Sequence, residues 1–333
     1  MGKPTYVKKT EGKEAMQKPS MEQLKKVGKL AGKMISFLSI LFVVYAIWKL
    51  GFDFQSIHNW TLFLAVAFAS VVLKCGTVYV SGSAWAGWLA FFAGRKIDKR
   101  EALCVYAKAN IGKYLPGNVM HYVERNLFAT NLDISQKKLA VSTILEVLGL
   151  VGVAFMLSVV VSAGQLAESF QLIFGDSYRK ILCVVAAIAL AIILAGCLFL
   201  RKRIAAVLME YTWADFVKTL LFSLLQYTAV LVGLGVIMVA LYAYMGGHVT
   251  WENASLIVSG YVVAWVLGFV IPGASGGIGV RELVITLLLG KIVGVEMVLT
   301  LSVIHRLITV IGDFLAYLVM LVLRRKNDEK NGG

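Results

Sequence analysis

Charged side chains are scarce in this 333-residue chain. Only 16% of its residues are Asp, Glu, Lys or Arg, while 59% are hydrophobic and the mean hydropathy is +0.78. A soluble domain averages about 25% charged and about 45–50% apolar residues. The scarcity of charge therefore excludes a soluble enzyme and a disordered chain, and it predicts an all-α polytopic integral membrane protein.

Cysteine is also rare. The four cysteines form no CxxC pair, and most of them lie inside apolar runs, where cysteine behaves as a small hydrophobic residue. They are Cys75, Cys104, Cys183 and Cys197. This pattern excludes a disulfide scaffold.

The sequence lacks the signatures of several enzyme classes. It contains no GxxxxGK[ST] loop, no HExxH motif and no DxD motif, and its four histidines have no metal-site spacing. The glycines of residues 273–279 have no βαβ context, so they do not form a dinucleotide fingerprint. We therefore expect neither a metal nor a cofactor.

Acidic residues are outnumbered by basic ones, 19 to 33, so the formal net charge is +14. A nucleic-acid-binding protein would place such an excess in a stripe with aromatic residues between the charges. Here the basic residues lie at both ends and between apolar blocks, where membrane proteins keep their cytoplasmic loops. The excess therefore predicts membrane orientation and contact with anionic lipids, and no nucleic-acid partner.

The tail of residues 1–33 carries nine Lys and three Glu. In residues 21–34, apolar side chains recur at helical spacing with lysines between them, which predicts a basic amphipathic helix on the cytoplasmic leaflet. A solvated tail that only sets orientation is the alternative. No small-residue cleavage site follows the first apolar run, so we expect an anchor and not a removed signal peptide.

Six apolar segments reach the roughly 20 residues that a helix needs to cross a bilayer. We expect spans at residues 34–52, 60–92, 138–163, 180–200, 217–245 and 297–323. The second and fifth are overlong, which predicts tilt or a kink, near Gly82 in the second. Residues 94–100, 201–203 and the tail 324–333 are basic, whereas residues 53–59, 164–178 and 246–252 contain no Lys or Arg. Because basic loops stay inside, we expect a multi-pass protein of the cytoplasmic (inner) membrane with both termini cytoplasmic.

Two more segments, residues 101–135 and 253–293, are partly apolar but contain charges and a Pro-Gly break. A broken backbone is tolerated in hydrocarbon only where protein covers it or it lines a wet cavity. We therefore expect each segment to form a re-entrant hairpin. Whether these hairpins are re-entrant or full spans decides between six and eight crossings.

The two hairpins resemble each other in sequence. In both, an Arg follows the proline of the break by nine positions and adjoins a Glu: Arg125 follows Pro116, and Arg281 follows Pro272. This spacing indicates an internal repeat.

The repeat extends into the following spans, where Glu146 matches Arg306. Each half reads span, span, hairpin, span, and the first half starts inside whereas the second starts outside. Residues 34–163 and 164–323 are therefore predicted to be inverted half-repeats. Transporters that bind at the bilayer midplane through discontinuous helices often have this plan.

The Pro-Gly breaks predict an anion site. A helix that restarts after a break presents free backbone N–H groups and a positive partial charge, which attract phosphate, and Arg matches a phosphate bidentately. We expect a lipid phosphate as the anion. The residues expected to bind it are Lys113, Pro116, Gly117, Asn118, Arg125, Gly273, Ser275, Gly276, Gly277 and Arg281.

Other ionisable residues interrupt the apolar spans. An ionised group near the bilayer centre costs about 2.5–3.5 kcal/mol on insertion scales, so each needs a partner or water. Those expected to gate or line a path are Glu124, Glu146, Glu282, His305, Arg306 and Asp313. A pair between Glu146 and Arg306 would satisfy both charges. Alternatively, the two hairpin arginines pair with nearby glutamates and only hold the hairpins in place. Lys74 and Lys108 are expected to extend toward the headgroups.

At these residues the sequence resembles a known family. The stretches GKYLPGNVMHYVERN, STILEVLGL, PGASGGIGVRE and IHRLITVIGD are similar to the membrane region of lysylphosphatidylglycerol synthase/flippase proteins. The resemblance covers roughly residues 30–323. It implies movement of an aminoacylated phospholipid between leaflets, without the soluble domain that attaches the amino acid. In stand-alone relatives it also implies cell-envelope glycolipid or polyprenyl-linked pathways.

These observations favour a flippase-like transporter that moves a phosphate-bearing lipid through a groove between two inverted halves. Two alternatives stay open: a membrane-embedded transferase acting on a lipid-linked substrate, and a scaffold for an envelope-synthesis enzyme. The expected partners are membrane lipids, envelope glycolipid-synthesis enzymes and, through small-residue patches, a second copy of the chain.

Overall fold

The computed structural model describes residues 59–114, 120–132, 134–175, 211–270, 277 and 279–331. All regular structure in these ranges is helical. Five of these helices are long and apolar enough to cross a membrane. The fold class is therefore that of an all-α, multi-pass membrane protein. The basic tail of residues 1–33 and the expected spans at 34–52 and 180–200 lie outside the described residues.

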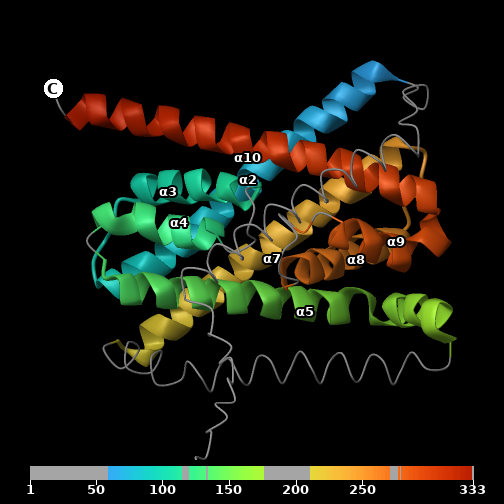
Figure 1. Ribbon diagram of the computed structural model, residues 1–333, viewed down its shortest axis with the longest axis horizontal. Helices are drawn as coiled ribbons and strands as arrows, with labels where there is room; N and C mark the ends of the chain where they lie inside the picture. Colours follow the sequence, from blue (N-terminus) through green and yellow to red (C-terminus); the bar gives the residue numbers. More distant parts are fainter. Residues whose placement is uncertain are drawn as a thin grey trace, which may run out of the picture.

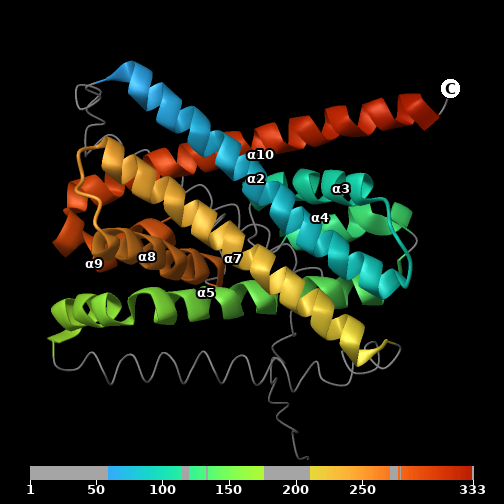
Figure 2. The ribbon, with the colours of Figure 1, turned by 180° about the vertical axis from the view of Figure 1, so that it is seen from behind.

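Four long helices correspond to expected spans: α2 (Trp60–Ala93), α5 (Gln136–Phe174), α7 (Trp213–Tyr244) and α10 (Val295–Asn331). Helices α2 and α7 pack against each other and cross between α5 and α10, which run along opposite sides of the molecule (Figures 1 and 2). At about 1.5 Å per residue, the 34 residues of α2 measure roughly 51 Å, against a hydrocarbon core of about 30 Å. This excess length agrees with the oblique crossing.

Polar and aromatic contacts fix α2 and α7 as an antiparallel pair. The Tyr244 hydroxyl, at the end of α7, donates to the carbonyl of Asn59 at the start of α2, over 3.2 Å. At the other end, the Tyr211 hydroxyl donates to the carbonyl of Phe92 over 2.5 Å. The start of α2 and the end of α7 therefore lie at one end of the molecule, and the end of α2 and the start of α7 lie at the other.

Local sequence accounts for where α2 and α7 begin and end. The Asn59 side chain accepts the Leu62 N–H at 3.0 Å and caps α2. Gly94 ends the helix with a φ of +64°, a conformation that favours glycine. Thr212 caps α7 by accepting the Asp215 N–H. Helix α2 continues unbroken through Gly82, where an added Cβ would lie 2.8 Å from Leu103 Cδ2. Gly82 therefore allows close approach of the next helix.

Two pairs of shorter helices fill opposite ends of the space between α5 and α10 (Figure 1). The first pair is α3 (Lys99–Ile111), continued by η2 (Gly112–Tyr114), and α4 (Met120–Phe128), continued by η3 (Ala129–Leu132). The second pair is α8 (Trp251–Val270) and α9 (Val280–Val293). In each pair the second helix packs back against the first.

The second helix pair differs from expectation in one respect. Helix α8 has 20 residues and is long and apolar enough to cross a membrane, although residues 253–293 were not expected to include a full-length span. The Pro-Gly break divides residues 253–293, which predicted two short helices. The apolar run before the break is nevertheless long enough to span a membrane on its own.

Helix α5 packs on α8, and α10 packs on both α3 and α9. Large apolar side chains on the outer faces remain exposed, among them Phe68, Phe155, Leu225 and Phe314. A water-soluble protein rarely exposes so much contiguous apolar surface. These faces are suited to contact with lipid chains.

Candidate functional site

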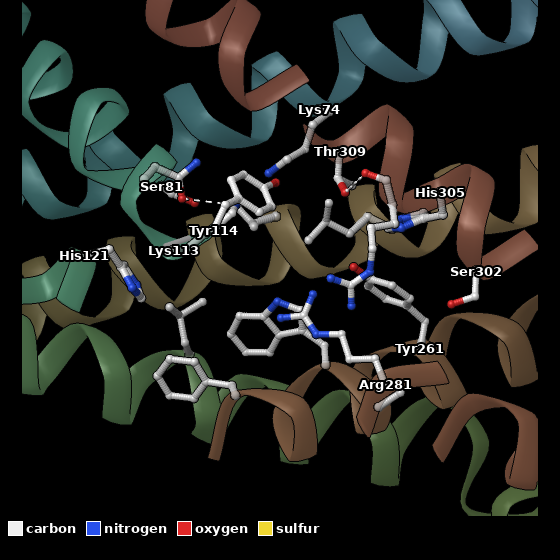
Figure 3. Close-up of a pocket in the computed structure, with 18 of the residues that line it drawn as sticks. Lys74, Ser81, Lys113, Tyr114, His121, Tyr261, Arg281, Ser302, His305 and Thr309 are labelled. Carbon is white, nitrogen blue, oxygen red and sulfur yellow. Dashed lines mark hydrogen bonds between the residues drawn. The ribbon is translucent and has the colours of Figure 1, made fainter. Parts of the chain in front are cut away.

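A cavity of about 140 Å³ lies at the centre of the helices, and each α-helix in the described part of the chain contributes to its walls (Figure 3). Five cationic side chains line it: Lys74, Lys113, Arg125, Arg281 and Arg306. They come from α2, η2, α4, α9 and α10. The sequence analysis expected four of them in the site or its path, and the structure brings these four to one cavity.

Asp313 holds the first group of charges. Its buried carboxylate forms ion pairs with Lys74, at 2.9 Å, and with Lys113, at 2.5 Å. It also accepts hydrogen bonds from the Asn110 side-chain amide at 2.8 Å and from the Tyr114 hydroxyl at 2.5 Å. One carboxylate thus serves two ammonium groups and connects α2, α3 with η2, and α10.

The position of Lys74 corrects the expectation that it extends toward the headgroups. Lys74 is buried, and its stem passes so close to Gly312 that a Cβ there would lie 2.5 Å from Lys74 Cγ. Burial is possible because Asp313 supplies the opposite charge. The sequence held a signal for this role, since Lys74 interrupts an apolar run just as Asp313 does. Lys108 is exposed and lies over the Phe128 ring at 4.1 Å.

Arg125 is fixed by Glu146. Its Nη1 donates to Oε1 at 3.0 Å and its Nη2 to Oε2 at 2.5 Å, and both side chains are buried. The rings of Trp85, Tyr106 and Tyr122 surround the guanidinium, with centroids 4.8 to 5.1 Å from its carbon. This bidentate pair neutralises Arg125 and ties α4 to α5, as the structural alternative for the hairpin arginines predicted.

Arg306 pairs with Glu282. The Arg306 Nε donates to Glu282 Oε1 at 2.9 Å, and Glu282 Oε2 accepts the Gly279 N–H at 2.6 Å. The predicted pair between Glu146 and Arg306 is therefore wrong. Helix α4 places Arg125 against Glu146 of α5, and helix α9 places Glu282 against Arg306 of α10. Glu146 and Arg306 thus each have a partner on the short helix that precedes them.

Arg281 differs from the other arginines. Among the described residues, no carboxylate pairs with it; its buried Nε, like that of Arg125, has no hydrogen-bond partner there. The side chain passes over Gly268, where a Cβ would lie 2.6 Å from Arg281 Cγ, and over Gly277, where a Cβ would lie 2.7 Å from Nε. Its guanidinium lies 5.9 Å from the centroid of the Trp265 ring and points into the cavity (Figure 3).

The sequence match between the halves explains why Arg281 lacks a carboxylate. Arg281 matches Arg125, whose partner is Glu146. The residue that matches Glu146 in the second half is Arg306, which needs a carboxylate itself. At the matched positions, Arg125 and Glu146 cancel, whereas Arg281 and Arg306 have one carboxylate between them, that of Glu282.

The remaining predicted residues fall into three groups. His305 lines the cavity, with Nε2 3.2 Å from the Leu234 carbonyl oxygen and its ring 4.6 Å from the Tyr261 ring. Glu124 does not line the cavity, and its carboxylate lies against Gly112 instead. Six predicted residues lie outside the described part of the chain: Pro116, Gly117, Asn118, Gly273, Ser275 and Gly276.

Comparisons with known proteins add no assignment to this cavity. No family model matches the chain, and a search of curated proteins finds no match. Within the described ranges, no three His, Cys, Asp or Glu side chains are grouped so that they could hold a metal ion. The chemistry of the cavity is that of cations grouped around a small buried space, which is suited to binding an anion.

Proposed function

We propose that this chain moves a phosphate-bearing lipid between the leaflets of a membrane. The observation that carries the proposal is the central cavity, where five cations meet only three paired carboxylates. Unneutralised cations at membrane depth are costly and tend to mark substrate pathways. The anions within reach of such a cavity are lipid phosphates, and Lys and Arg bind phosphate well.

Two inverted halves would give such a lipid a path. The pairing of α5 with α8 and of α10 with α3 supports this arrangement, as does the antiparallel packing of α2 and α7. The helix pairs α3–α4 and α8–α9 approach the centre from opposite ends (Figure 2), as re-entrant hairpins of inverted repeats would do. Transporters of this plan bind substrate where discontinuous helices meet.

The resemblance to the membrane region of lysylphosphatidylglycerol synthase/flippase proteins supports the same function. The substrate classes it implies are phospholipids, aminoacyl-phospholipids and polyprenyl-linked or other glycolipids. Because the cavity is built by both halves, the headgroup would cross between them, in contact with Arg281 and Lys113. Arg306, Glu282 and His305 would line the path, whereas Arg125 and Glu146 would brace the first hairpin.

A membrane-embedded transferase gains less support from the geometry. A transferase needs a carboxylate free to act as general base. Glu282 is the cavity-lining carboxylate of the described residues, and both of its oxygens already accept hydrogen bonds, from Arg306 and from the Gly279 N–H.

A lipid-translocation assay tests the proposal. Purified protein is reconstituted into liposomes that contain fluorescent phosphatidic acid or phosphatidylglycerol, and the loss of inner-leaflet fluorescence to an impermeant quencher is followed. We expect Arg281→Ala to reduce translocation to the rate of protein-free liposomes. Its melting temperature should remain close to wild type, because Arg281 makes no ion pair with the described residues. The control is Lys108→Ala, which removes an exposed cation outside the cavity. Undiminished translocation by a folded Arg281→Ala protein would contradict the proposal.

A further inference from the structure

The charges around the central cavity do not cancel. The cations that line it are Lys74, Lys113, Arg125, Arg281 and Arg306. The carboxylates that pair with them are Asp313, Glu146 and Glu282. The segments that join the helix pairs, residues 115–119 and 271–276, contain no charged residue. With histidines neutral, the described residues of the cavity therefore carry an excess of two positive charges.

The excess is located at two points. Arg125 and Arg306 each have a carboxylate of their own. Lys74 and Lys113 share the carboxylate of Asp313, which leaves one charge there. The second charge is that of Arg281, which enters the cavity from the side opposite Lys74 (Figure 3). A ligand between them would meet one net positive charge on each side.

We propose that the cavity binds a lipid whose headgroup ends in a phosphomonoester. It binds such a lipid in preference to one whose headgroup phosphate is a phosphodiester. This inference rests on the proposed function and names the substrate class. A phosphomonoester carries a charge of about −1.5 to −2 at pH 7, whereas a phosphodiester carries a single negative charge. An uncompensated charge in a low-dielectric interior is unfavourable. A dianion cancels the whole excess of the cavity, and a monoanion leaves one cation unneutralised.

The same charge balance disfavours a lysylated phospholipid. Its lysyl group contributes positive charges that more than offset the phosphodiester, so its headgroup would add to the excess. The cavity volume agrees with a small headgroup: about 140 Å³ is close to the roughly 150 Å³ of an apolar cavity that admits benzene. A phosphate group has a similar number of heavy atoms to benzene.

Donors suited to a phosphate are present at both points. The Arg281 guanidinium points into the cavity, and its buried Nε has no partner among the described residues. Lys113 Nζ also donates to the Asn110 side chain at 3.2 Å, and an ammonium with three donors retains one beyond that bond and Asp313. A phosphomonoester has three terminal oxygens to accept from these groups.

Native mass spectrometry with matched lipids tests this preference. Detergent-purified protein is mixed with phosphatidic acid, phosphatidylglycerol and lysylphosphatidylglycerol of identical acyl chains, and the retained lipids are counted. We expect wild type to bind phosphatidic acid about tenfold more tightly than phosphatidylglycerol, and lysylphosphatidylglycerol most weakly. Arg281→Gln should bring the first two affinities close together, whereas Lys108→Gln should keep the wild-type preference.

Equal binding of phosphatidic acid and phosphatidylglycerol by wild type would overturn the inference. If translocation still depended on Arg281 in that case, the proposed function would stand and only the substrate class would fall. A second arm compares methyl phosphate with a short-chain phosphatidic acid as stabilisers of the melting temperature. The lipid should stabilise far more. Equal stabilisation would identify the ligand as a soluble phosphomonoester and overturn the assignment to a lipid.

Discussion

At the scale of single residues, the two matching arginines have opposite surroundings. Arg125 has a bidentate carboxylate and three aromatic rings around it, so it has little left to offer a ligand. Arg281 passes over two glycines instead, and its guanidinium lies 5.9 Å from the centroid of the Trp265 ring. Sequence spacing makes these residues equivalent, but the position that holds Glu146 in the first case holds Arg306 in the second, so only Arg125 has that carboxylate as its partner.

The glycine beneath Arg281 provides a residue-scale prediction. In Gly268→Ala, the new Cβ would lie 2.6 Å from Arg281 Cγ, so the guanidinium has to move. We expect affinity for phosphatidic acid to fall about tenfold, because a hydrogen bond to a charged group contributes about 1.5–3 kcal/mol. Lipid retention in native mass spectrometry measures the change.

The matched control for this substitution is Gly76→Ala, also in the interior of a helix. An added Cβ at Gly76 meets nothing within 4 Å, and replacing a helical glycine with alanine contributes about 0.5–1 kcal/mol of stability. Gly76→Ala should therefore retain wild-type affinity. Wild-type affinity in Gly268→Ala as well would mean that Arg281 need not occupy its observed position to bind lipid.

At the scale of helices, Asp313 joins elements that are distant in the sequence. Its contacts hold α10 against α2 and against the end of α3. A second ion pair, between Glu101 and Arg324 at 3.8 Å, joins α3 and α10 at the surface. Helices α3 and α10 are thus connected once in the protein interior and once at its surface.

This pair of contacts yields the element-scale prediction. Asp313→Asn should cost about 3–5 kcal/mol of unfolding free energy, because it leaves Lys74 and Lys113 buried without a carboxylate. Glu101→Gln should cost at most about 1 kcal/mol, because its ion pair is solvent-exposed. Denaturant titration in mixed micelles measures both values. Equal losses for the two variants would show that the Asp313 network does not hold these helices together.

The sequence predicted the helices better than the contacts between them. Hydropathy alone placed α2 at residues 60–92, against Trp60–Ala93 in the structure. It ended α5 at residue 163 and α10 at residue 323, whereas these helices continue to Phe174 and Asn331, and it began α7 at residue 217 instead of Trp213. Apolar runs show where a helix is buried or meets lipid. Polar ends such as the start of α5 extend the helix into regions that hydropathy does not mark.

Side-chain pairing was harder to predict for a physical reason. A repeat shows which positions are equivalent in the two halves, but equivalent positions need not touch. Glu146 and Arg306 occupy such positions, yet each pairs with a charge on the short helix of its own half. Lys74 was misjudged because a long lysine side chain reaches polar headgroups from many depths. Only the packing of α10 against α2 shows that the carboxylate of Asp313 lies within reach of Lys74.

At the scale of the whole molecule, α5 packs on α8, and α10 packs on both α3 and α9. The proposed inverted halves would therefore share the walls of the cavity, and relative movement of the two would reshape it. Such movement is how inverted-repeat transporters expose a site to one side of the membrane and then the other.

The proposed inverted arrangement predicts which loops face the cell exterior. The loop that follows α2 contains Lys96 and lies at one end of the molecule, and the loop that follows α7 contains His248 and lies at the other, since α2 and α7 are antiparallel. Residues 94–100 include four basic residues, which keep a loop cytoplasmic. In a cysteine-free background, an impermeant maleimide should label His248→Cys in intact cells and Lys96→Cys only after lysis. The reverse pattern would retain the inverted halves but place the termini outside. Labelling of both positions in intact cells, or of neither, would be incompatible with α2 and α7 crossing the membrane in opposite directions, and hence with inverted halves around the cavity.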